Sequence, residues 1–325
     1  MRVYSVETEN FRLLQPQRVE FGPGVNVICG QNAQGKTTLL EAVWLLTGGK
    51  SFRTFYDREL IAFDQEEARV EGSFHAALRD QTLELRFPRG RTRQIRQNGV
   101  KKRPSELDGV LHAILFSPDD LAMVRGPASL RRRLLDGAIS QLRPGYAAVL
   151  ADYNRLYENK LRILKDWREK PSLLEALDDF SDSLCRHSAR LIRYRASFAR
   201  RLSEEARPIQ RELSSGKEEL SVRYATVSTV MDPEGSEREI YEAVAERQRQ
   251  LRQAELDAET CLVGAHKDDL EISVNGKNAR AFASQGQTRT AALSIKLAER
   301  EIFLNETGEY PILLLDDVLS ELDPR

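Results

Sequence analysis

The residues with the clearest chemistry lie near the N-terminus, where a glycine-rich segment fits the pattern G-x-x-x-x-G-K-S/T. This segment and the residue after it are Gly30, Gln31, Asn32, Ala33, Gln34, Gly35, Lys36, Thr37 and Thr38. The two glycines let the backbone curl so that its N–H groups surround a polyphosphate at a helix N-terminus. Lys36 can then reach the β- and γ-phosphates, and the Thr37 hydroxyl can bind Mg²⁺. The pattern predicts ATP and Mg²⁺ as cofactors, with Lys36 as a catalytic residue.

The flanking sequence has the form that this loop requires. Residues 25–29 are a short apolar run typical of a buried strand, and residues 38–46 have the composition of a helix. A strand before the loop and a helix after it favour a phosphate-binding loop over the alternative, an ordinary surface loop.

A second group of chemical residues follows an apolar run at 312–315. The run predicts a buried parallel strand that ends at two acids, Asp316 and Asp317. Ligands of open α/β sheets bind at the carboxyl ends of strands. We therefore expect Asp316 to hold Mg²⁺ and Asp317 to polarise the attacking water. The alternative is a strand followed by a solvated acidic turn.

A third candidate is Ser284-Gln285-Gly286-Gln287, which precedes a segment, 288–303, with helical spacing of its apolar residues. A Ser and a Gly at a helix N-terminus can bind an anion, so Ser284, Gly286 and Gln287 are candidate nucleotide ligands. Read alone, the same four residues could be an ordinary helix cap.

The overall composition limits the function classes. The chain has 325 residues and a net charge of −1, so any nucleic acid must be held by a local basic patch. No apolar run approaches the length of a membrane span, and no signal peptide is recognisable. Cys29, Cys185 and Cys261 lack the spacing of metal ligands and are most simply reduced thiols. These features predict a cytoplasmic protein with no membrane partner.

The chain divides into three stretches, and the order of their elements indicates an α/β fold. Residues 1–128 are mixed α/β, with a tight hairpin expected at Asn98-Gly99. Residues 129–256 are charged and helix-like, with helices expected at 130–142, 146–167, 172–213 and 237–256. In residues 257–325 sheet character returns, with a hairpin expected between strands at 269–274 and 277–282, joined at Asn275-Gly276. We expect one ATPase head built from both chain ends, with an antiparallel strand group and an inserted helical domain.

Several segments, taken in order, resemble the RecF family of the SMC/Rad50-like branch of the ABC ATPases. The segments that carry this resemblance are Glu9–Arg12, Ser51–Thr54, Phe116–Leu121, Arg131–Asp136, Gly264–Leu270 and Leu314–Asp323. In this family Ser284–Gln287 matches the signature motif and Ser320–Asp323 the D-loop. The chain departs from the family pattern at Phe52, Ala265 and Lys267, and we find no clear Gln-loop.

The resemblance implies a recombination mediator that binds duplex and gapped DNA without regard to sequence and works with a RecR-type protein. It places the chain in DNA repair and replication, DNA damage and the SOS response. It also implies an ATP-dependent homodimer, in which Ser284 and Gly286 of one protomer close over the γ-phosphate bound by the other. Arg12, in the family's N-F-R segment, joins the expected nucleotide ligands. ATP hydrolysis would be slow, DNA-stimulated and used as a conformational switch.

The sequence fits three other functions less well. An architectural DNA-tethering ATPase of the SMC/Rad50 type would need a long coiled coil, and the helical stretches here are too short. A transporter ATPase would need coupling surfaces for a membrane partner, and a nuclease would need a further metal-carboxylate domain. The best basic clusters for DNA are Arg131-Arg132-Arg133 and Lys101-Lys102-Arg103, although basic runs often coat solvated faces.

Overall fold

The computed structural model describes residues 1–48, 51–54, 56–107 and 109–317. They form two compact units. Unit 1 comprises residues 1–118, 141–144 and those from 299 onward, and unit 2 comprises residues 119–140 and 145–298. The domain limits expected from the sequence lie at 128 and 256. Those limits stay a prediction. The two compact units divide at 118 and 298, where the later strands and the start of the last helix group with the helical stretch.

The main sheet of unit 1 is antiparallel, with six strands in the order β2-β1-β3-β4-β5-β6. The strands are β1 (Arg2–Glu9), β2 (Gln17–Glu20), β3 (Glu67–Ala76), β4 (Arg79–Pro88), β5 (Gln94–Gln97) and β6 (Val100–Lys102). Half-buried and buried residues alternate along β3, as expected where one face of a sheet covers a core. Asn98 and Gly99 both have positive φ and join β5 to β6, which confirms the predicted hairpin.

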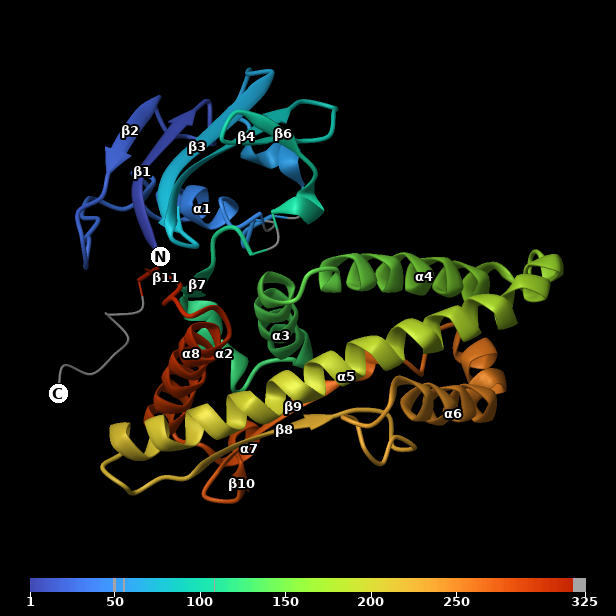
Figure 1. Ribbon diagram of the computed structural model, residues 1–325. Helices are drawn as coiled ribbons and strands as arrows, with labels where there is room; N and C mark the ends of the chain where they lie inside the picture. The colour runs from blue at the N-terminus through green and yellow to red at the C-terminus, as the bar shows by residue number, and fades with distance from the viewer. Residues whose placement is uncertain (49–50, 55, 108, 318–325) are drawn as a thin grey trace. The chain divides into compact units, whose positions relative to one another are not determined.

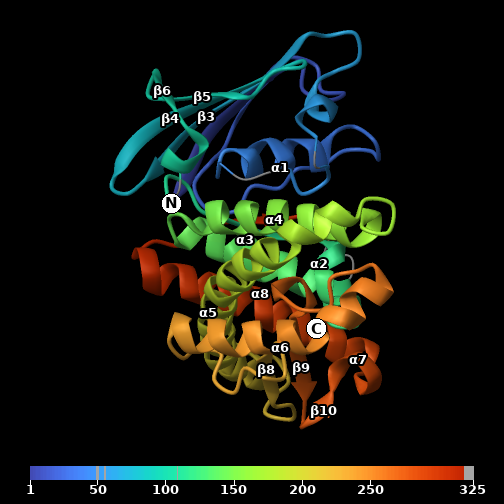
Figure 2. The same cartoon turned by 90° about the vertical axis from the view of Figure 1, so that its right-hand side faces the viewer.

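Helix α1 (Lys36–Leu45) belongs to the same core as this sheet (Figures 1 and 2). It buries Leu39, Ala42 and Val43. The chain at the end of the helix comes so close to β3 that a Cβ atom at Gly72 would lie 2.2 Å from Leu46 Cδ1. A glycine at position 72 therefore lets the phosphate-loop helix sit directly on the sheet.

A second, two-stranded sheet of unit 1 pairs β7 (Ala113–Phe116) with β11 (Ile312–Leu315) in parallel. All four residues of β7 are buried. The backbone N–H of Asp316 donates to the Phe116 carbonyl at 2.9 Å, so the ladder continues to the end of the strand. This confirms the predicted parallel strand that carries Asp316 out at its C-terminal end.

Unit 2 is built around a helix of 40 residues, α5 (Leu174–Leu213), which runs beside α4 and β8 in Figure 1. Its other elements are α2 (Pro118–Met123), α4 (Tyr146–Asp166), β8 (Leu220–Ala225), α6 (Glu237–Ala258), β9 (Asp269–Val274), β10 (Lys277–Asn278) and α7 (Ala279–Phe282). Strands β8, β9 and β10 form an antiparallel sheet in the order β10-β9-β8. Helices α3 (Ala128–Leu142) and α8 (Gln285–Thr307) contribute residues to both units, as does α2, whose first residue, Pro118, belongs to unit 1.

The predicted helices of the middle stretch correspond to α3, α4, α5 and α6, with ends that differ by a few residues. Two details differ from expectation. Strand β8 was missed, and residues 277–282 form a two-residue strand followed by α7, where Asn278 caps the helix through Arg280 N–H, instead of a full second strand. In the described part of the chain, no helix combines the length and apolar character needed to cross a membrane.

Candidate nucleotide site

The phosphate loop is held open by close backbone contacts. Gly35 has φ of 94° and caps α1, and a Cβ atom there would lie 2.3 Å from Leu14 Cδ2. Only glycine satisfies both the left-handed conformation and the space. The Lys36 ammonium donates to the carbonyls of Gly30 at 2.8 Å and of Gln31 at 2.9 Å. The lysine is thus folded back over the loop that it is expected to serve.

The loop is otherwise organised by its own side chains. The Gln31 N–H donates to Gln34 Oε1 at 3.0 Å, and Ala33 has φ of 65°. Residues 29–34 of the loop are exposed, whereas Thr38 is buried in the first turn of α1. Exposed backbone at a helix N-terminus suits an anion, because unpaired N–H groups and the helix dipole both favour negative charge.

The two halves of the predicted metal site meet across the sequence. The Thr37 hydroxyl donates to Asp316 Oδ1 at 2.9 Å, although 279 positions separate the two residues. A hydroxyl and a carboxylate are hard oxygen donors of the kind that Mg²⁺ prefers. Asp317 follows on the exposed side with φ of 53°. The structure therefore brings the phosphate loop and the acidic strand of unit 1 together, as the motifs predict.

One expected element is absent from this site. Residues 25–29 were predicted to form a buried strand, and this was wrong: they have no strand assignment, and Val25 and Val27 are 92% and 78% exposed. A lone extended segment needs a neighbour to satisfy its backbone. Among the described residues no strand pairs with this segment, so apolar composition alone did not bury it.

Arg12 lies beside α1, but its side chain is committed to a carboxylate. Its Nε and Nη2 donate to the two carboxylate oxygens of Glu41 at 2.6 and 2.7 Å, and Nη1 donates to the Glu59 carbonyl at 3.3 Å. Arg53 also reaches Glu41 at 3.5 Å and Thr38 Oγ1 at 3.3 Å. Sequence reasoning missed Glu41. Its signal was an acid inside the otherwise apolar stretch that follows the loop.

The signature residues belong to unit 2, at the start of α8. The Gln287 N–H donates to Ser284 Oγ at 3.2 Å, and the Ser284 N–H donates to Gln287 Oε1 at 2.9 Å. This reciprocal pair is a capping box, so the local geometry matches the cap reading of the motif. The Gly286 carbonyl accepts a hydrogen bond from Thr290 Oγ1 at 3.0 Å. The family D-loop at 320–323 lies outside the described residues.

Two other segments that resemble the family, Arg131–Asp136 and Gly264–Leu270, contact each other within unit 2. Arg131 is 3% exposed and pairs with both carboxylate oxygens of Asp269, at 2.6 and 2.8 Å. Arg132 donates to the Asp268 carbonyl at 2.7 Å. Arg131 was proposed as part of a basic surface cluster, and this was wrong, because buried bonds hold it inside the protein.

Residues 264–268, the loop before β9, join these buried bonds of unit 2. Arg195 pairs with Asp136 at 2.8 Å and donates to the Ala265 carbonyl at 2.7 Å. His266 bonds Tyr153 at 2.7 Å, and burial lowers the pKa of His266 to about 4. A neutral, hydrogen-bonded imidazole and a paired arginine point to a structural role for these two family segments.

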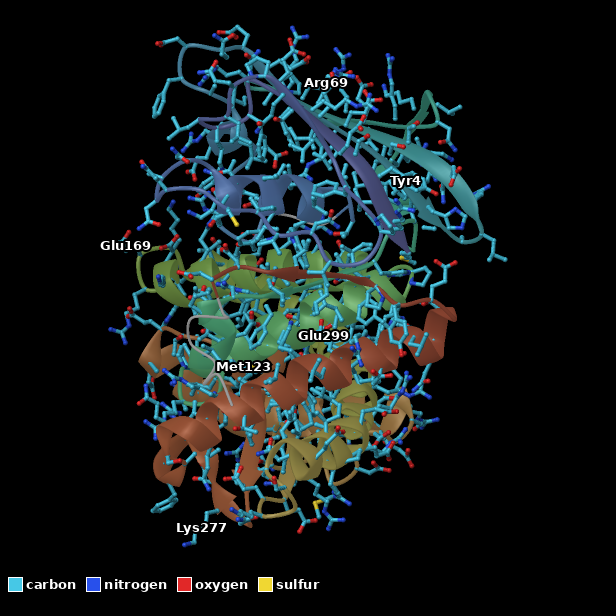
Figure 3. The ribbon with its side chains drawn as sticks, turned by 90° about the vertical axis from the view of Figure 1, so that its left-hand side faces the viewer. Tyr4, Arg69, Met123, Glu169, Lys277 and Glu299 are labelled. Atoms are coloured by element: carbon cyan, nitrogen blue, oxygen red, sulfur yellow. The ribbon has the colours of Figure 1, made fainter. Side chains whose placement is uncertain are left out.

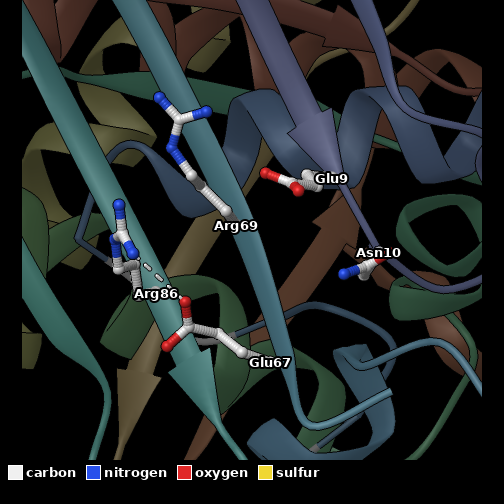
Figure 4. A pocket seen from close by; sticks show the side chains of 5 residues that line it. All are labelled: Glu9, Asn10, Glu67, Arg69 and Arg86. Atoms are coloured by element: carbon white, nitrogen blue, oxygen red, sulfur yellow. Dashed lines mark hydrogen bonds and ion pairs between the residues drawn. The ribbon is translucent and has the colours of Figure 1, made fainter. Parts of the chain in front are cut away.

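A polar pocket opens on the strands of unit 1 (Figure 4), and Arg69 projects from β3 in Figure 3. Arg86 reaches Glu67 at 3.3 Å, and Arg69 reaches Glu7 at 2.9 Å and Glu84 at 3.0 Å. The residues that line the pocket are Glu9, Asn10, Glu67, Arg69 and Arg86. Because both arginines are neutralised by carboxylates, the pocket is a poor match for a phosphate.

Known proteins with similar sequences and structures identify the family. A family described as "AAA domain" matches residues 5–259. "DNA replication and repair protein RecF" of Listeria monocytogenes serotype 4b is 39% identical over 99% of this chain and 87% of its own length. The protein of the same name from Geobacillus kaustophilus is 40% identical over 97% of this chain and 84% of its own length.

A solved structure agrees with the sequence comparison. The structure described as the recombination mediator protein RecF-ATPrS in the RecFOR pathway aligns with a TM-score of 0.92 and 36% identity, over 99% of this chain and 86% of that chain. The agreement covers both the ATPase elements and the helical unit, which confirms the expected α/β ABC-type ATPase fold. With the phosphate loop and acidic strand in contact, the chain belongs to the RecF family of DNA replication and repair proteins.

Proposed function

We propose that this chain is an ATP-dependent DNA-binding recombination mediator that acts at single-strand gaps and stalled replication forks. The observation that carries the proposal is the hydrogen bond between Thr37 and Asp316, which joins the phosphate loop to the acidic strand. The similar structures described as RecF-ATPrS and RecF-ATP, in the RecFOR pathway, support ATP as the ligand and a RecR-type protein as partner.

In this proposal, the loop N–H groups at 30–37 bind the ATP phosphates and Lys36 leaves the Gly30 and Gln31 carbonyls for the β- and γ-phosphates. Thr37 and Asp316 hold Mg²⁺, which neutralises the developing charge on the transferred phosphoryl group. Asp317 polarises the attacking water. Each of these groups lies in unit 1, so one protomer supplies the whole nucleotide-binding half of the site.

The signature residues complete the site from a second protomer. Ser284 and Gly286 lie at the N-terminus of α8, a helix of 23 residues whose dipole favours the γ-phosphate. ATP would therefore bring two protomers together, and slow hydrolysis, stimulated by DNA, would separate them. In this proposal ATP hydrolysis serves to switch the protein between the ATP-bound dimer and separate protomers, and the ADP and phosphate released have no further role. The proposed setting is the cytoplasm.

The experiment that tests this function measures nucleotide affinity and particle mass together. Lys36→Ala should weaken ATP binding by about tenfold or more and abolish ATP-dependent dimerisation. The variant removes the positive charge that Lys36 would place beside the β- and γ-phosphates. Ser284→Arg should bind ATP as the wild type does but stay monomeric, since a bulky cation blocks the closing surface. Affinity comes from titration of a fluorescent ATP analogue, and mass from light scattering.

Lys36→Arg is the matched control, because it keeps the charge: ATP binding should be retained in part while hydrolysis is lost. An unchanged ATP affinity in Lys36→Ala would place the nucleotide elsewhere. A dimer without nucleotide, or a Ser284→Arg protein that dimerises normally, would exclude closure by the signature residues.

A further inference from the structure

A buried carboxylate lies directly behind the phosphate loop. The Glu41 side chain has no exposed surface. Glu41 lies one helical turn after Thr37 on α1, the helix that follows the phosphate loop. A buried carboxylate is costly unless it is paired and hydrogen-bonded. Glu41 is therefore kept in place by its partners, and its partners are kept in place by it.

Those partners come from two separate segments of unit 1. Arg12 binds both carboxylate oxygens, in the bidentate geometry that gives arginine pairs their strength. The Ser51 hydroxyl donates to Glu41. Ser51 Oγ in turn accepts the backbone N–H groups of Arg53 at 2.9 Å and Thr54 at 3.1 Å. Glu41 thus fixes the turn at residues 51–54 as well as Arg12.

The charges of this cluster do not cancel. Two guanidinium groups, of Arg12 and Arg53, share the single carboxylate of Glu41. Arg12 is 17% exposed at its side chain and tightly bound, whereas Arg53 is 42% exposed and reaches Glu41 only at 3.5 Å. One unit of positive charge is therefore left beside Thr38, the residue that follows the metal ligand Thr37.

We propose that Glu41 is a positioning residue for nucleotide turnover. Its carboxylate holds Arg12 and the 51–54 turn in fixed places, and it reduces the positive charge that a bound triphosphate meets. The inference rests on the proposed function, since it assumes ATP at the phosphate loop. In the structure Arg12 is bound to Glu41, so the expected contact of Arg12 with nucleotide would be made only by leaving this carboxylate.

Removing the charge of Glu41 should have two opposite effects. Glu41→Gln keeps the size and an oxygen acceptor for Arg12, but it leaves two arginines without a counter-charge. ATP should bind about fivefold more tightly, because one negative charge near the phosphates is gone. The kcat should fall about tenfold, because Arg12 and the turn are no longer held in one position. The KM and kcat would fall together.

Matched variants separate this role from simple damage. Glu66→Gln removes an exposed carboxylate of unit 1 outside this cluster and should leave both constants unchanged. Glu41→Asp keeps the charge but shortens the side chain, so it should keep the wild-type affinity and lose kcat. If Glu41→Gln folds poorly, the double variant Arg12→Gln with Glu41→Gln has the wild-type net charge and should show wild-type affinity with low kcat.

The measurement is titration of a fluorescent ATP analogue, steady-state ATPase kinetics and thermal unfolding on every variant. Weaker ATP binding in Glu41→Gln, accompanied by a lower unfolding temperature, would show that Glu41 is merely structural. Constants in Glu41→Gln equal to those of Glu66→Gln would also overturn the inference. Lys36→Ala in the same titration tests the site itself: if it binds ATP normally, the proposed function fails instead.

Discussion

At the scale of single residues, His112 shows how burial sets a pH limit on stability. The residue is 4% exposed and stacks edge-on against Phe303, and its Nδ1 has no hydrogen-bond partner among the described residues. Burial lowers the pKa of His112 to about 4. The folded protein therefore keeps this imidazole neutral, while the unfolded chain takes up a proton near pH 6.5.

We predict that the free energy of unfolding falls as the pH drops from about 6.5 to about 4. The unfolded state binds more protons in this window, so stability rises with pH and is complete above about 6.5. The shift corresponds to about 3 kcal/mol. Urea unfolding across the pH range should show this slope, and His112→Phe should reduce it, leaving the part that comes from His266, whose pKa is lowered to about 4 as well.

His75→Gln is the control for that series, because His75 is a half-exposed residue on β3, away from the core. It should leave the slope unchanged. An identical pH dependence in wild type and His112→Phe would mean that another group causes the loss of stability at low pH.

The residues of the phosphate loop could be predicted from the sequence because their chemistry is local. Glycines, a lysine and a threonine at fixed spacing act through backbone that they shape themselves. The contact of Thr37 with Asp316 was also predictable, because the apolar run at 312–315 ends at Asp316 and ligands bind at the carboxyl ends of such strands. Glu41 was not, because its meaning depends on Arg12 and Ser51, which only the folded chain places beside it.

At the scale of elements, the sequence predicted the long helices and the short strand at 312–315, but it wrongly predicted a strand at 25–29 and did not predict β8. Helices α4 and α5 have regular apolar spacing along their length. Residues 25–29 are a short apolar run, and β8 is a short segment that alternates apolar and polar residues. Whether such short segments form strands depends on their neighbours. For 25–29 no paired strand exists among the described residues, whereas β8 pairs with β9 along its whole length.

Arg131 allows a test at this scale. It joins α3 to β9 through Asp269 and also donates to the carbonyls of Met123 at 2.8 Å and Gly126 at 2.9 Å. Arg131→Ala would leave these acceptors and the carboxylate without their partner. We expect unit 2 to lose about 3–5 kcal/mol of stability, measured by urea unfolding.

The neighbouring residue provides the matched control. Arg133 is exposed on the same helix, so Arg133→Ala should change stability by less than about 0.5 kcal/mol. Equal losses in the two variants would mean that the pairing with Asp269 does not hold unit 2 together. Because Arg131 is buried, an Arg131 variant that loses DNA binding must first be shown to be stably folded. Only then does the loss indicate a missing DNA contact.

At the scale of the whole molecule, the net charge of −1 means that DNA must be held by a local surface. The strongest candidate is the hairpin of β5 and β6, where Arg96 and Lys101 are exposed and lie directly opposite one another. Like charges across a strand pair are unfavourable. A phosphate placed between them would relieve that repulsion, and Arg103 adds a third exposed cation nearby in the chain.

We predict that ATP raises the affinity for duplex DNA, because the proposed ATP-bound dimer would present this hairpin twice to one duplex. Arg96→Glu with Lys101→Glu should lower that affinity by about tenfold or more. It should also flatten the dependence on salt, since each lost phosphate contact removes about 0.9 from the slope of log K against log salt. Fluorescence anisotropy with ATP, with ADP and without nucleotide, over a salt series, measures both quantities.

The control carries the same change in net charge on exposed residues of unit 2, Lys170→Glu with Lys277→Glu. If both pairs weaken binding equally, the effect is a general one of charge and the hairpin is not the DNA surface. Affinity should depend little on base sequence, because phosphates carry no base identity. Equal affinity in all three nucleotide states would break the link between the ATP site and DNA, even with the phosphate loop and the acidic strand assigned correctly.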